Sequence, residues 1–358
     1  MKIKSKIKDY TLEMVNDVWG QRENLFSNFK YGKLFFFVDE NFFNRYKDGL
    51  KGFIGQDFCL TIEAIEENKS FSKLADYYNA LLKAGLTRND VLVTFGGGVL
   101  QDISGFIAST LYRGIQWVVF PTTLLAQADS CIGSKTSINF DNSKNLIGTF
   151  YPPDRVYLDI RFCETLTAQQ FNSGLGEIIK FHLLSNRQKF DDLKASLCAE
   201  DLHQGETLKQ MIMSTLEIKR SYFEEDEFDT GRRNLLNYGH CYGHALESAS
   251  NFCIAHGEAV LVGMGFVNLL SLQRGLLVKE RYEEIEAMLR KYYPRYDLSR
   301  IRVEDIINYL KRDKKRIGEG LTMILAKDIG DHVKITDIKE SEVIATNNAF
   351  VKTYPSVA

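Results

Sequence analysis

Hydrophobic and polar positions divide the chain into two parts with different patterns. In the first part, short apolar runs alternate with segments in which apolar residues recur at helical spacing. The runs at 33–40, 90–95 and 115–120 are typical of buried strands, and residues 70–86 are typical of an amphipathic helix. Strands that alternate with helices predict a βαβ domain with a parallel sheet.

The second part follows a helical pattern over most of its length. Helical periodicity extends over 173–315, and only a short piece around 321–338 has the pattern of two strands. The most apolar stretch, 259–275, is too short and too polar for a membrane span, because Asn268 and Arg274 interrupt it. We therefore expect a buried helix there.

The boundary between the two parts is marked by proline. Residues 149–162 hold the only Pro-Pro pair of the chain and predict the crossing from one domain to the next. A chain of 358 residues also exceeds the size at which a single core usually stops growing. The predicted fold class is an α/β nucleotide-binding domain with a parallel sheet at 1–160, followed by a mainly α-helical domain at 161–358.

Composition and charge indicate which partners and which cellular compartment to expect. A net charge of −2 and 26% charged residues indicate neither a nucleic-acid nor a membrane partner. The six cysteines are scattered without a C-x-x-C pair, which argues against a zinc ribbon or a disulfide scaffold. The first ten residues lack the apolar core of a signal peptide. We therefore expect a cytoplasmic protein.

A glycine-rich turn follows one of the predicted strands. Gly96–Gly98 lie between that strand and a helix expected to open near Asp102. Glycines permit close backbone approach, and a helix N-terminus offers free N–H groups to a phosphate, so the turn suits a dinucleotide. A plain turn is the alternative. Thr122 and Thr123 follow the next strand and are further candidates for nucleotide contact.

Charged residues lie in otherwise apolar surroundings further along the chain. Lys135 and Lys144 lie among apolar and small residues, where lysines either reach the surface or bind an anionic substrate. Asp129 precedes them and could accept a hydrogen bond from a substrate hydroxyl. Glu177 and Lys180 share one face of an apolar helix, so this charged pair is expected to be interior and to serve a metal or a substrate.

Half of the six histidines lie within seventeen residues, at positions 240, 244 and 256. A helix predicted at 234–250 places several polar residues on one face, namely Asn237, His240 or Cys241, His244 and Glu247. A lone histidine would be interpreted as a surface or capping residue. Three in one window favour a metal site, with His256 contributed after a loop.

The identity of the third ligand and the role of His244 stay open at this point. Two imidazoles and one carboxylate would bind Zn²⁺ and leave a position for substrate. Spacing does not rank the three candidate carboxylates, which are Glu177, Glu247 and Glu258. Spacing also does not decide whether His244 is a ligand or a proton carrier.

Taken together, these residues resemble the dehydroquinate synthase family of sugar-phosphate cyclases. The resemblance runs from about residue 34 to residue 315, in matching order and spacing. The strings that carry it are GGGVLQDISGF, YRGIQWVVFPTTLLAQADSCIGSKTSIN, KNLIGTFYPP, GLGEIIK, RRNLLNYGHCYGHALE and HGEAV. It implies a nucleotide-binding α/β domain and a mostly α-helical domain, with the active site between them.

The resemblance also implies a set of site residues. The metal ligands would be Glu177, His240 and His256, with His244 as a polar catalytic residue and not a ligand. Substrate contacts would be Lys135, Lys144, Asn145, Lys180, Lys219, Arg233, Asn237 and one of Lys314 and Lys315. NAD contacts would be Gly97, Gly98, Asp102, Thr122, Thr123 and Leu125, joined by Asp129, Lys135 and Lys144. Arg113 would reach the site of a neighbouring subunit, which implies a homodimer.

The implied reaction converts a seven-carbon phosphorylated keto acid into a carbocycle and releases phosphate. NAD would act as a regenerated catalyst, and the metal would be Zn²⁺, with Co²⁺ as the alternative. Three departures from the usual pattern concern the substrate: Ser134 and Ser137 stand where glycines are frequent, Gln101 stands where a glycine is common, and Cys241 and Tyr242 replace frequent Thr and Phe.

Two other functions compete with this interpretation. A sister cyclase would act on sedoheptulose 7-phosphate or on an amino analogue of the keto acid, and a metal-dependent polyol dehydrogenase would share the architecture. Arg233 and Asn237 are retained, as a carboxylated substrate requires, and the dehydrogenase would not need the many lysines.

Overall fold

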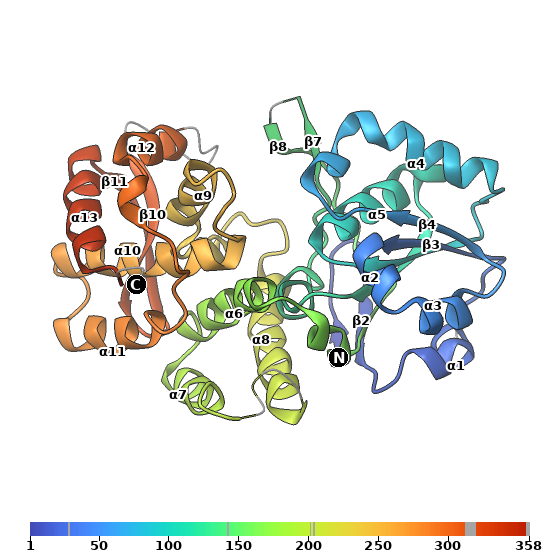
Figure 1. The fold of residues 1–358 in the computed structure, drawn as a ribbon, viewed down its shortest axis with the longest axis horizontal. Coiled ribbons are helices and arrows are strands. Elements are labelled where there is room, and N and C mark those ends of the chain that lie inside the picture. Colours follow the sequence, from blue (N-terminus) through green and yellow to red (C-terminus); the bar gives the residue numbers. More distant parts are fainter. Residues whose placement is uncertain (28, 142, 201, 203–204, 312–319, 356–358) are drawn as a thin grey trace. The chain divides into compact units, whose positions relative to one another are not determined.

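The computed structural model describes the chain except residues 28, 142, 201, 203–204, 312–319 and 356–358, and it is drawn in Figure 1. The chain divides into two compact units, residues 1–165 and residues 166–358. The first unit holds a seven-stranded sheet, and the second is mainly helical.

The strands are β1 (Lys2–Ile3), β2 (Tyr10–Met14), β3 (Leu34–Asp39), β4 (Phe58–Ile62), β5 (Val91–Gly96), β6 (Gln116–Pro121), β7 (Ile138–Phe140), β8 (Ser143–Ile147), β9 (Arg155–Leu158), β10 (Leu321–Asp328) and β11 (Asp331–Ile338). The α-helices are α1 (Arg22–Phe26), α2 (Glu40–Arg45), α3 (Lys47–Ile54), α4 (Phe71–Lys83), α5 (Gly98–Thr110), α6 (Ala168–Leu183), α7 (Arg187–Ser196), α8 (Gly205–Glu225), α9 (His240–Ala249), α10 (His256–Gln273), α11 (Lys279–Leu289), α12 (Val303–Lys311) and α13 (Glu340–Thr353). Shorter helical turns are η1 (Trp19–Gln21), η2 (Glu66–Lys69), η3 (Leu111–Arg113), η4 (Ala126–Ser130), η5 (Ile160–Thr165), η6 (Arg232–Asn237) and η7 (Leu298–Arg300).

The sheet of the first unit is parallel except at one edge. Its strand order is β1-β2-β9-β6-β5-β3-β4, and only β1 pairs antiparallel with its neighbour. The strands predicted at 33–40, 90–95 and 115–120 are confirmed as β3, β5 and β6. The sheet thus has the predicted α/β class, with the carboxyl ends of β5 and β6 side by side.

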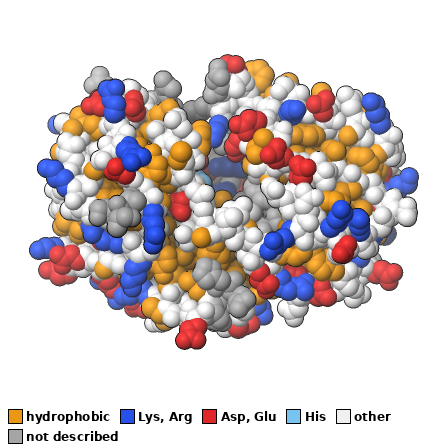
Figure 2. Space-filling view, viewed as in Figure 1, with side chains coloured by type: hydrophobic (Ala, Val, Ile, Leu, Met, Phe, Trp, Pro, Cys, Tyr) orange, Lys and Arg blue, Asp and Glu red, His pale blue; other side chains and the backbone are white. Residues whose placement is uncertain are grey.

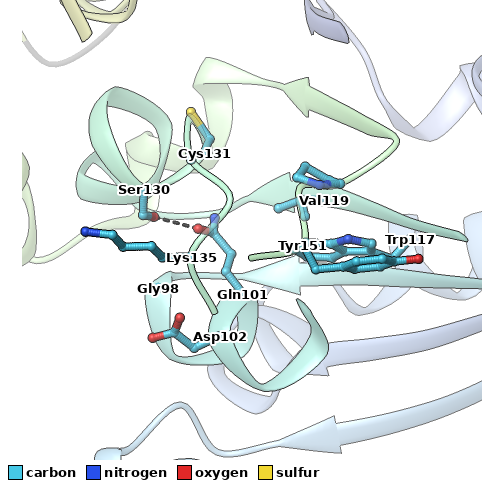
Figure 3. A pocket seen from close by; sticks show the side chains of 11 residues that line it. Gly98, Gln101, Asp102, Trp117, Val119, Ser130, Cys131, Lys135 and Tyr151 are labelled. Carbon is cyan, nitrogen blue, oxygen red and sulfur yellow. Dashed lines mark hydrogen bonds between the residues drawn. The ribbon is translucent and has the colours of Figure 1, made fainter. Parts of the chain in front are cut away.

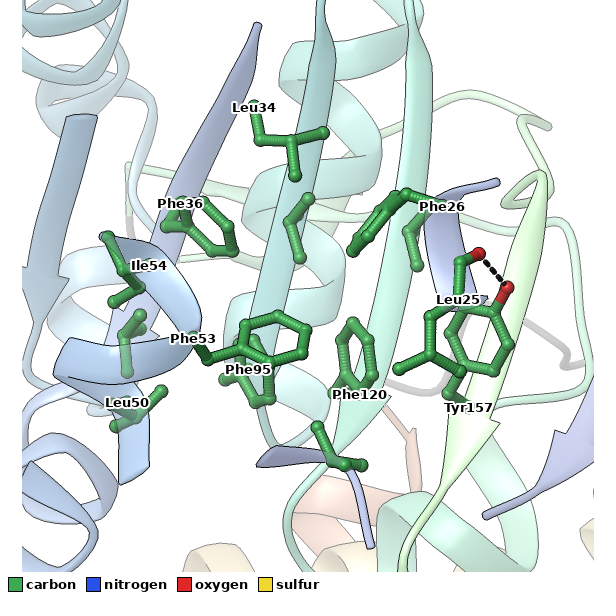
Figure 4. Close-up of a cluster of buried hydrophobic side chains, with 14 of the residues drawn as sticks. Leu25, Phe26, Leu34, Phe36, Leu50, Phe53, Ile54, Phe95, Phe120 and Tyr157 are labelled. Carbon is green, nitrogen blue, oxygen red and sulfur yellow. Dashed lines mark hydrogen bonds between the residues drawn. The ribbon is translucent and has the colours of Figure 1, made fainter. Parts of the chain in front are cut away.

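Aromatic side chains fill the space beneath one face of this sheet. Figure 4 shows Phe53 of α3 against Phe95 of β5, with Phe120 of β6 beside it. The rings of Phe95 and Phe120 stack with centroids 4.3 Å apart. Tyr157 of β9 closes the cluster and donates a hydrogen bond from its hydroxyl to the carbonyl oxygen of Leu25, at 2.6 Å. Each fully buried ring contributes about 2–3 kcal/mol of apolar burial.

The opposite face of the sheet is covered by α4 and α5, as Figure 1 shows. Successive strand residues point to opposite faces, so Phe35 and Phe37 of β3 face these helices while Phe36 faces the aromatic cluster. Ile103 and Ile107 of α5 are fully buried against the sheet. This packing fixes the direction of α5 as it leaves β5.

Two predictions for the first unit need correction. Residues 149–162, expected as the crossing between domains, contribute strand β9 to the sheet, because Val156 and its neighbours are apolar enough to pair between β2 and β6. The helix expected to open near Asp102 begins at Gly98, since Gly98 itself adopts the first helical position after the extended N-cap Gly97. Asp102 therefore lies in the second turn of α5.

The second unit is built around a helix buried on all sides. The stretch predicted as a buried helix at 259–275 is confirmed as α10, most of whose residues are buried. The predicted two-stranded piece is confirmed as the antiparallel pair β10 and β11. Among the residues that the structure describes, no helix combines the length and the hydrophobicity that a bilayer-crossing segment needs.

The histidine helix is shorter than predicted. Residues 232–237 form the turn η6, and the helix α9 begins only at His240. Gly239 separates the two with φ of +77°, a left-handed conformation that favours glycine. A Cβ there would also lie 2.7 Å from the carbonyl oxygen of Val260. Asn237 therefore does not share a helix face with the histidines, contrary to the prediction.

The surface carries charge of both signs. On the face that Figure 2 shows, Lys, Arg, Asp and Glu side chains are interspersed. This distribution agrees with the net charge of −2.

Candidate metal centre and dinucleotide site

The candidate metal centre depends on a close crossing of α6 and α10. A Cβ on Gly176 would lie 2.2 Å from the carbonyl oxygen of Gly257, and one on Gly257 would lie 1.7 Å from that of Ser173. Only glycines permit this approach. Glu177, which follows Gly176, and His256, which precedes Gly257, are thereby brought together.

The Glu177 carboxylate lies between two imidazoles. Its Oε1 is 3.4 Å from Nε2 of His240 and 3.3 Å from Nε2 of His256. Zinc bonds of 2.0–2.2 Å in a tetrahedron place neighbouring ligand atoms about 3.3–3.5 Å apart. The carboxylate is fully buried, and neither of its oxygens has a hydrogen-bond partner among the described residues. These three residues therefore fit a divalent cation.

The outward nitrogens of both imidazoles face acceptors. His240 Nδ1 lies 3.2 Å from the carbonyl oxygen of Tyr238, and His256 Nδ1 lies 3.3 Å from Oε2 of Glu247. A proton on each Nδ1 leaves the Nε2 lone pair directed at Glu177, the usual arrangement around protein-bound zinc. Glu247, one of the three candidate carboxylates, thus contacts a histidine, while Glu258 instead accepts from the backbone N–H of Ala255.

The third histidine of the cluster, His244, lies one helical turn after His240 on α9. Ligand nitrogens of His240, His244 and His256 all lie within 4.8 Å of one another. His244 is exposed, whereas the other two are partly buried. Its exposure suits a group that meets substrate, which is the role predicted for it.

Electrostatics of the cluster favour a positive partner. Burial opposes ionisation of Glu177, but Lys180 and the imidazoles hold its pKa well below the ordinary value. Burial and Lys180 lower the pKa of His240, which keeps that ring neutral. Burial also acts to lower the pKa of His256, but the carboxylates of Glu177 and Glu247 raise this pKa to about 10. A cation between Glu177, His240 and His256 would thus face the Glu177 carboxylate, while Glu247 contacts the outward nitrogen of His256.

Two buried lysines share the interior of this unit with the carboxylate. Lys180 is 2% exposed and forms an ion pair with Glu177, which confirms the predicted interior pair on α6. Lys219 of α8 is also buried. Their ammonium groups lie 4.5 and 6.0 Å from the ring centroid of Phe181. Buried lysines of this kind are suited to bind an anionic group of a ligand.

Arg233 is held by the turn that precedes it. The backbone N–H of Arg233 donates to Asp226 Oδ2 at 3.0 Å, and its guanidinium donates to the carbonyl oxygen of Glu227 at 2.5 Å. Although burial acts in the opposite direction, N–H groups of Thr230, Gly231 and Arg233 lower the pKa of Asp226 to about 2. Arg233 lies on the turn η6, and Asn237 is the last residue of η6. The predicted contacts Lys314 and Lys315 lie outside the described residues.

The candidate dinucleotide site lies at the carboxyl ends of β5 and β6. Gly97 occupies the N-cap of α5, and no side chain of the described residues caps its first N–H groups. Gly98 follows as the first helical residue. Free N–H groups at a helix start bind phosphate, so the turn fits the pyrophosphate of NAD.

The second loop of this site joins the first through the backbone. Thr122 donates its N–H to the carbonyl oxygen of Gly96 at 3.2 Å, and the Thr123 hydroxyl accepts from the N–H of Ala126 at 3.1 Å. The π-helical turn η4 follows and carries Asp129, with Leu125 just before it. Such turns are rare and occur mainly at functional sites.

Lys69, which sequence reasoning missed, joins the predicted NAD contact Asp102 to the predicted substrate contact Asn145. Its ammonium group is buried and lies 3.1 Å from Asp102 Oδ2 and 2.9 Å from Asn145 Oδ1. Ser137 donates to the same two residues, at 2.7 and 2.8 Å. Burial raises the pKa of Asp102, and Lys69 opposes that effect. In the sequence, Lys69 stands in a charged run that has the pattern of a solvated turn.

The remaining predicted residues of the first unit are exposed. Lys135 lies in the segment after η4, Lys144 lies on β8, and Arg113 ends η3. The region expected to be loop-rich around Lys144 forms the antiparallel hairpin of β7 and β8 instead. The sequence pattern did not predict that β7 and β8 pair, because Lys144 and Asn145 interrupt the alternation of apolar and polar residues.

A parallel α/β unit with a phosphate-binding turn, and a helical unit with a buried carboxylate between imidazoles, are typical of NAD- and metal-dependent enzymes. Two family models narrow this class: 3-dehydroquinate synthase N-terminal matches residues 59–173, and 3-dehydroquinate synthase C-terminal matches residues 174–316. The chain belongs to the 3-dehydroquinate synthase family.

Relatives agree with this assignment. A 3-dehydroquinate synthase of Clostridium perfringens is 41% identical over 270 residues, 74% of this chain and 76% of that protein. One of Dictyoglomus thermophilum is 34% identical over 96% of both chains. Among solved structures, a 2-epi-5-epi-valiolone synthase of Streptomyces hygroscopicus with NAD⁺ and Zn²⁺ bound is 25% identical, with a TM-score of 0.86 over 98% of both chains.

Proposed function

We propose that the chain converts 3-deoxy-D-arabino-heptulosonate 7-phosphate into 3-dehydroquinate and phosphate. The observation that carries this proposal is the buried Glu177 carboxylate at ligand-to-ligand distance from His240 and His256. Family membership over both units supports it. Arg233 and Asn237, as in the family pattern, support a carboxylated substrate.

Bound NAD would supply a hydride acceptor for the carbon that carries a substrate hydroxyl, and bound Zn²⁺ or Co²⁺ would supply a Lewis acid beside that hydroxyl. Lys180, Lys219 and Arg233 would bind the anionic groups of the substrate and fix its orientation. His244 would move a proton at its imidazole, whose ordinary pKa lies near neutrality. Asp129 would accept a hydrogen bond from a hydroxyl of substrate or cofactor.

Each unit would have its own part in this reaction. The first unit would bind NAD through Gly97, Gly98, Asp102, Thr122, Thr123, Leu125, Asp129, Lys135 and Lys144. The second would bind the metal through Glu177, His240 and His256, and the substrate through its buried cations. Lys135, Lys144 and Asn145 of the first unit would contact the substrate as well.

We further propose a homodimer in the cytoplasm. Arg113 is exposed and has φ of +66°, and its neighbour Tyr112 is 41% exposed with φ of +53°. An exposed aromatic and an arginine on a strained turn suit a contact with a second subunit. All six cysteines are free, which supports a reducing compartment.

The second candidate is a sister cyclase. The likeness to a 2-epi-5-epi-valiolone synthase favours it, since that protein has the same fold over nearly its whole length. A sister cyclase for sedoheptulose 7-phosphate would act on a substrate without the carboxylate that Arg233 is suited to bind, whereas the amino analogue of the keto acid keeps that carboxylate.

A substrate panel separates the candidates. The purified protein would be given the heptulosonate phosphate, its amino analogue, sedoheptulose 7-phosphate and a simple polyol, with phosphate release, product mass and NADH absorbance followed together. We expect equal amounts of phosphate and carbocycle from the heptulosonate phosphate, without accumulation of NADH. Turnover of sedoheptulose 7-phosphate alone would favour the sister cyclase, and NADH formed from the polyol would indicate a dehydrogenase.

A further inference from the structure

The segment that carries Asp129 and Lys135 spans a cavity. This cavity of about 100 Å³ is lined by the first turns of α5, by β6 and by residues 130–135, and it is drawn in Figure 3. Space of this size holds about three water molecules. Ser130 and Lys135 line the cavity together with Gln101 of α5, so at this point a hydrogen bond joins the segment to the helix.

Two adjacent residues of α5 form hydrogen bonds to the two ends of this segment, whose middle is held by a bond from the Gly133 N–H to the Tyr10 hydroxyl. Ser130 donates from Oγ to Gln101 Oε1 at 2.6 Å, the bond dashed in Figure 3. At the other end, Ser137 donates its backbone N–H to Asp102 Oδ1 at 3.0 Å and its hydroxyl to Oδ2 at 2.7 Å. Lys135 lies between these two anchors.

The Gln101 anchor has a cost in stability. The Gln101 side chain is 8% exposed, and its Nε2 is buried without a hydrogen-bond partner among the described residues. A buried N–H group that meets no protein acceptor must pair with water in this cavity, or it destabilises the folded state. An apolar side chain of the same length would avoid this penalty. A side chain that costs stability and contacts a predicted site segment has the features of a functional residue.

We propose that Gln101 is a positioning residue, which holds the η4 turn through Ser130 and thereby places Asp129 and Lys135 for cofactor and substrate. The inference rests on the proposed function, because the roles of Asp129 and Lys135 do. Gln101 is not among the predicted cofactor or substrate contacts. It acts through the hydroxyl of Ser130, which is the residue next to Asp129.

The test uses Gln101→Met, which keeps the length of the side chain and removes both the acceptor and the unpaired N–H₂. NAD⁺ binding is measured by calorimetry without substrate, thermal unfolding is measured on the same samples, and kcat and KM are measured separately. We expect the dissociation constant of NAD⁺ to rise at least fivefold and kcat/KM to fall 10- to 100-fold, while Tm stays equal or rises. A merely structural glutamine would lower Tm and leave NAD⁺ affinity unchanged, and that result would overturn the proposal.

Two further variants make the result specific to the hydrogen bond. Ser130→Ala should reproduce the effect of Gln101→Met, Ser130→Thr should preserve affinity because it keeps the hydroxyl, and the double variant should be no worse than either single one. Additive losses would contradict the proposed pair. Ser104→Ala is the matched control, because its hydroxyl is also buried and unpartnered in the described part of α5. A wild-type protein that binds no NAD⁺ would refute the proposed function itself.

Discussion

At the scale of single residues, the candidate centres depend on partners that are far apart in the sequence. Glu177 meets His240 and His256 across more than sixty residues, and Lys69 meets Asn145 across 76. In both cases a buried charge is matched by groups from other elements. The reactive character of these side chains therefore belongs to the cluster and not to any one residue.

Substitutions at the metal centre should separate ligands from the remaining histidine. We expect Glu177→Ala, His240→Ala and His256→Ala to weaken Zn²⁺ binding by at least 100-fold, because each removes one of three ligands. His244→Ala should retain the metal and lower kcat by about 10²–10⁴-fold through loss of proton transfer. Elemental analysis after dialysis, combined with steady-state kinetics, measures both.

Cys241→Ala is the control for these variants. It lies on α9 directly beside His240 and is the thiol nearest to the ligands in sequence, so loss of metal in this variant would mean that the ligand set is wrong. A metal-free His244→Ala protein would likewise make His244 a ligand.

At the scale of elements, short turns decide where the functional side chains point. Gly239 lies between η6 and α9 and is the N-cap of α9, which begins at His240. The close crossing of α6 and α10 at their glycines places His256 beside Glu177. The turn before η6 is held by the Asp226 carboxylate, which accepts three backbone N–H groups. These turns and the glycine crossing fix the positions of Arg233 and of the histidines.

Loss of the Asp226 charge should loosen the turn that presents Arg233. Because the pKa of Asp226 is lowered to about 2, its contribution to stability is present above the unfolded value of 3.8 and is lost as pH falls through about 2. We expect Asp226→Asn to lower the free energy of unfolding by about 1–3 kcal/mol at pH 7 and to raise KM for the substrate. Denaturant titrations from pH 7 to pH 2 should show the difference from wild type shrinking below pH 4.

Glu225→Gln is the matched control for this experiment. Glu225 is the neighbouring residue, and its ion pair with Arg232 is about half exposed, so its loss should change stability by less than about 1 kcal/mol. An Asp226→Asn protein with the same stability as this control would contradict the role of the turn.

At the scale of the whole molecule, the sequence predicts a second subunit that contributes Arg113. Exposure of Tyr112 and Arg113 on a turn with positive φ supports that prediction. The prediction concerns function as well as assembly, because each active site would then need residues from two chains.

Complementation between inactive variants tests this arrangement. Arg113→Ala and Glu177→Ala should each be nearly inactive alone. After unfolding and refolding as an equal mixture, half of the dimers are mixed, and one of their two sites has both residues intact, so activity should return to about a quarter of wild type. Activity that stays at the level of the separate variants would mean that Arg113 acts within its own chain or not at all.

The sequence by itself determined the class of each element and the kinds of chemistry available. Apolar runs in β3, β5 and β6 and the mainly apolar sequence of α10 predict their structures, because the local pattern of apolar residues reflects burial. The motif order indicates the family, and the family models match it over both units. The interior position of Glu177 and Lys180 also followed from the apolar face around them.

Only the tertiary structure decided which of these groups have partners. It placed β9 in the sheet, started α9 at His240 and revealed the anchors Lys69 and Gln101, none of which has a local signal. The physical reason is that a hydrogen bond or an ion pair depends on distance in space, while periodicity records only which face of an element is buried.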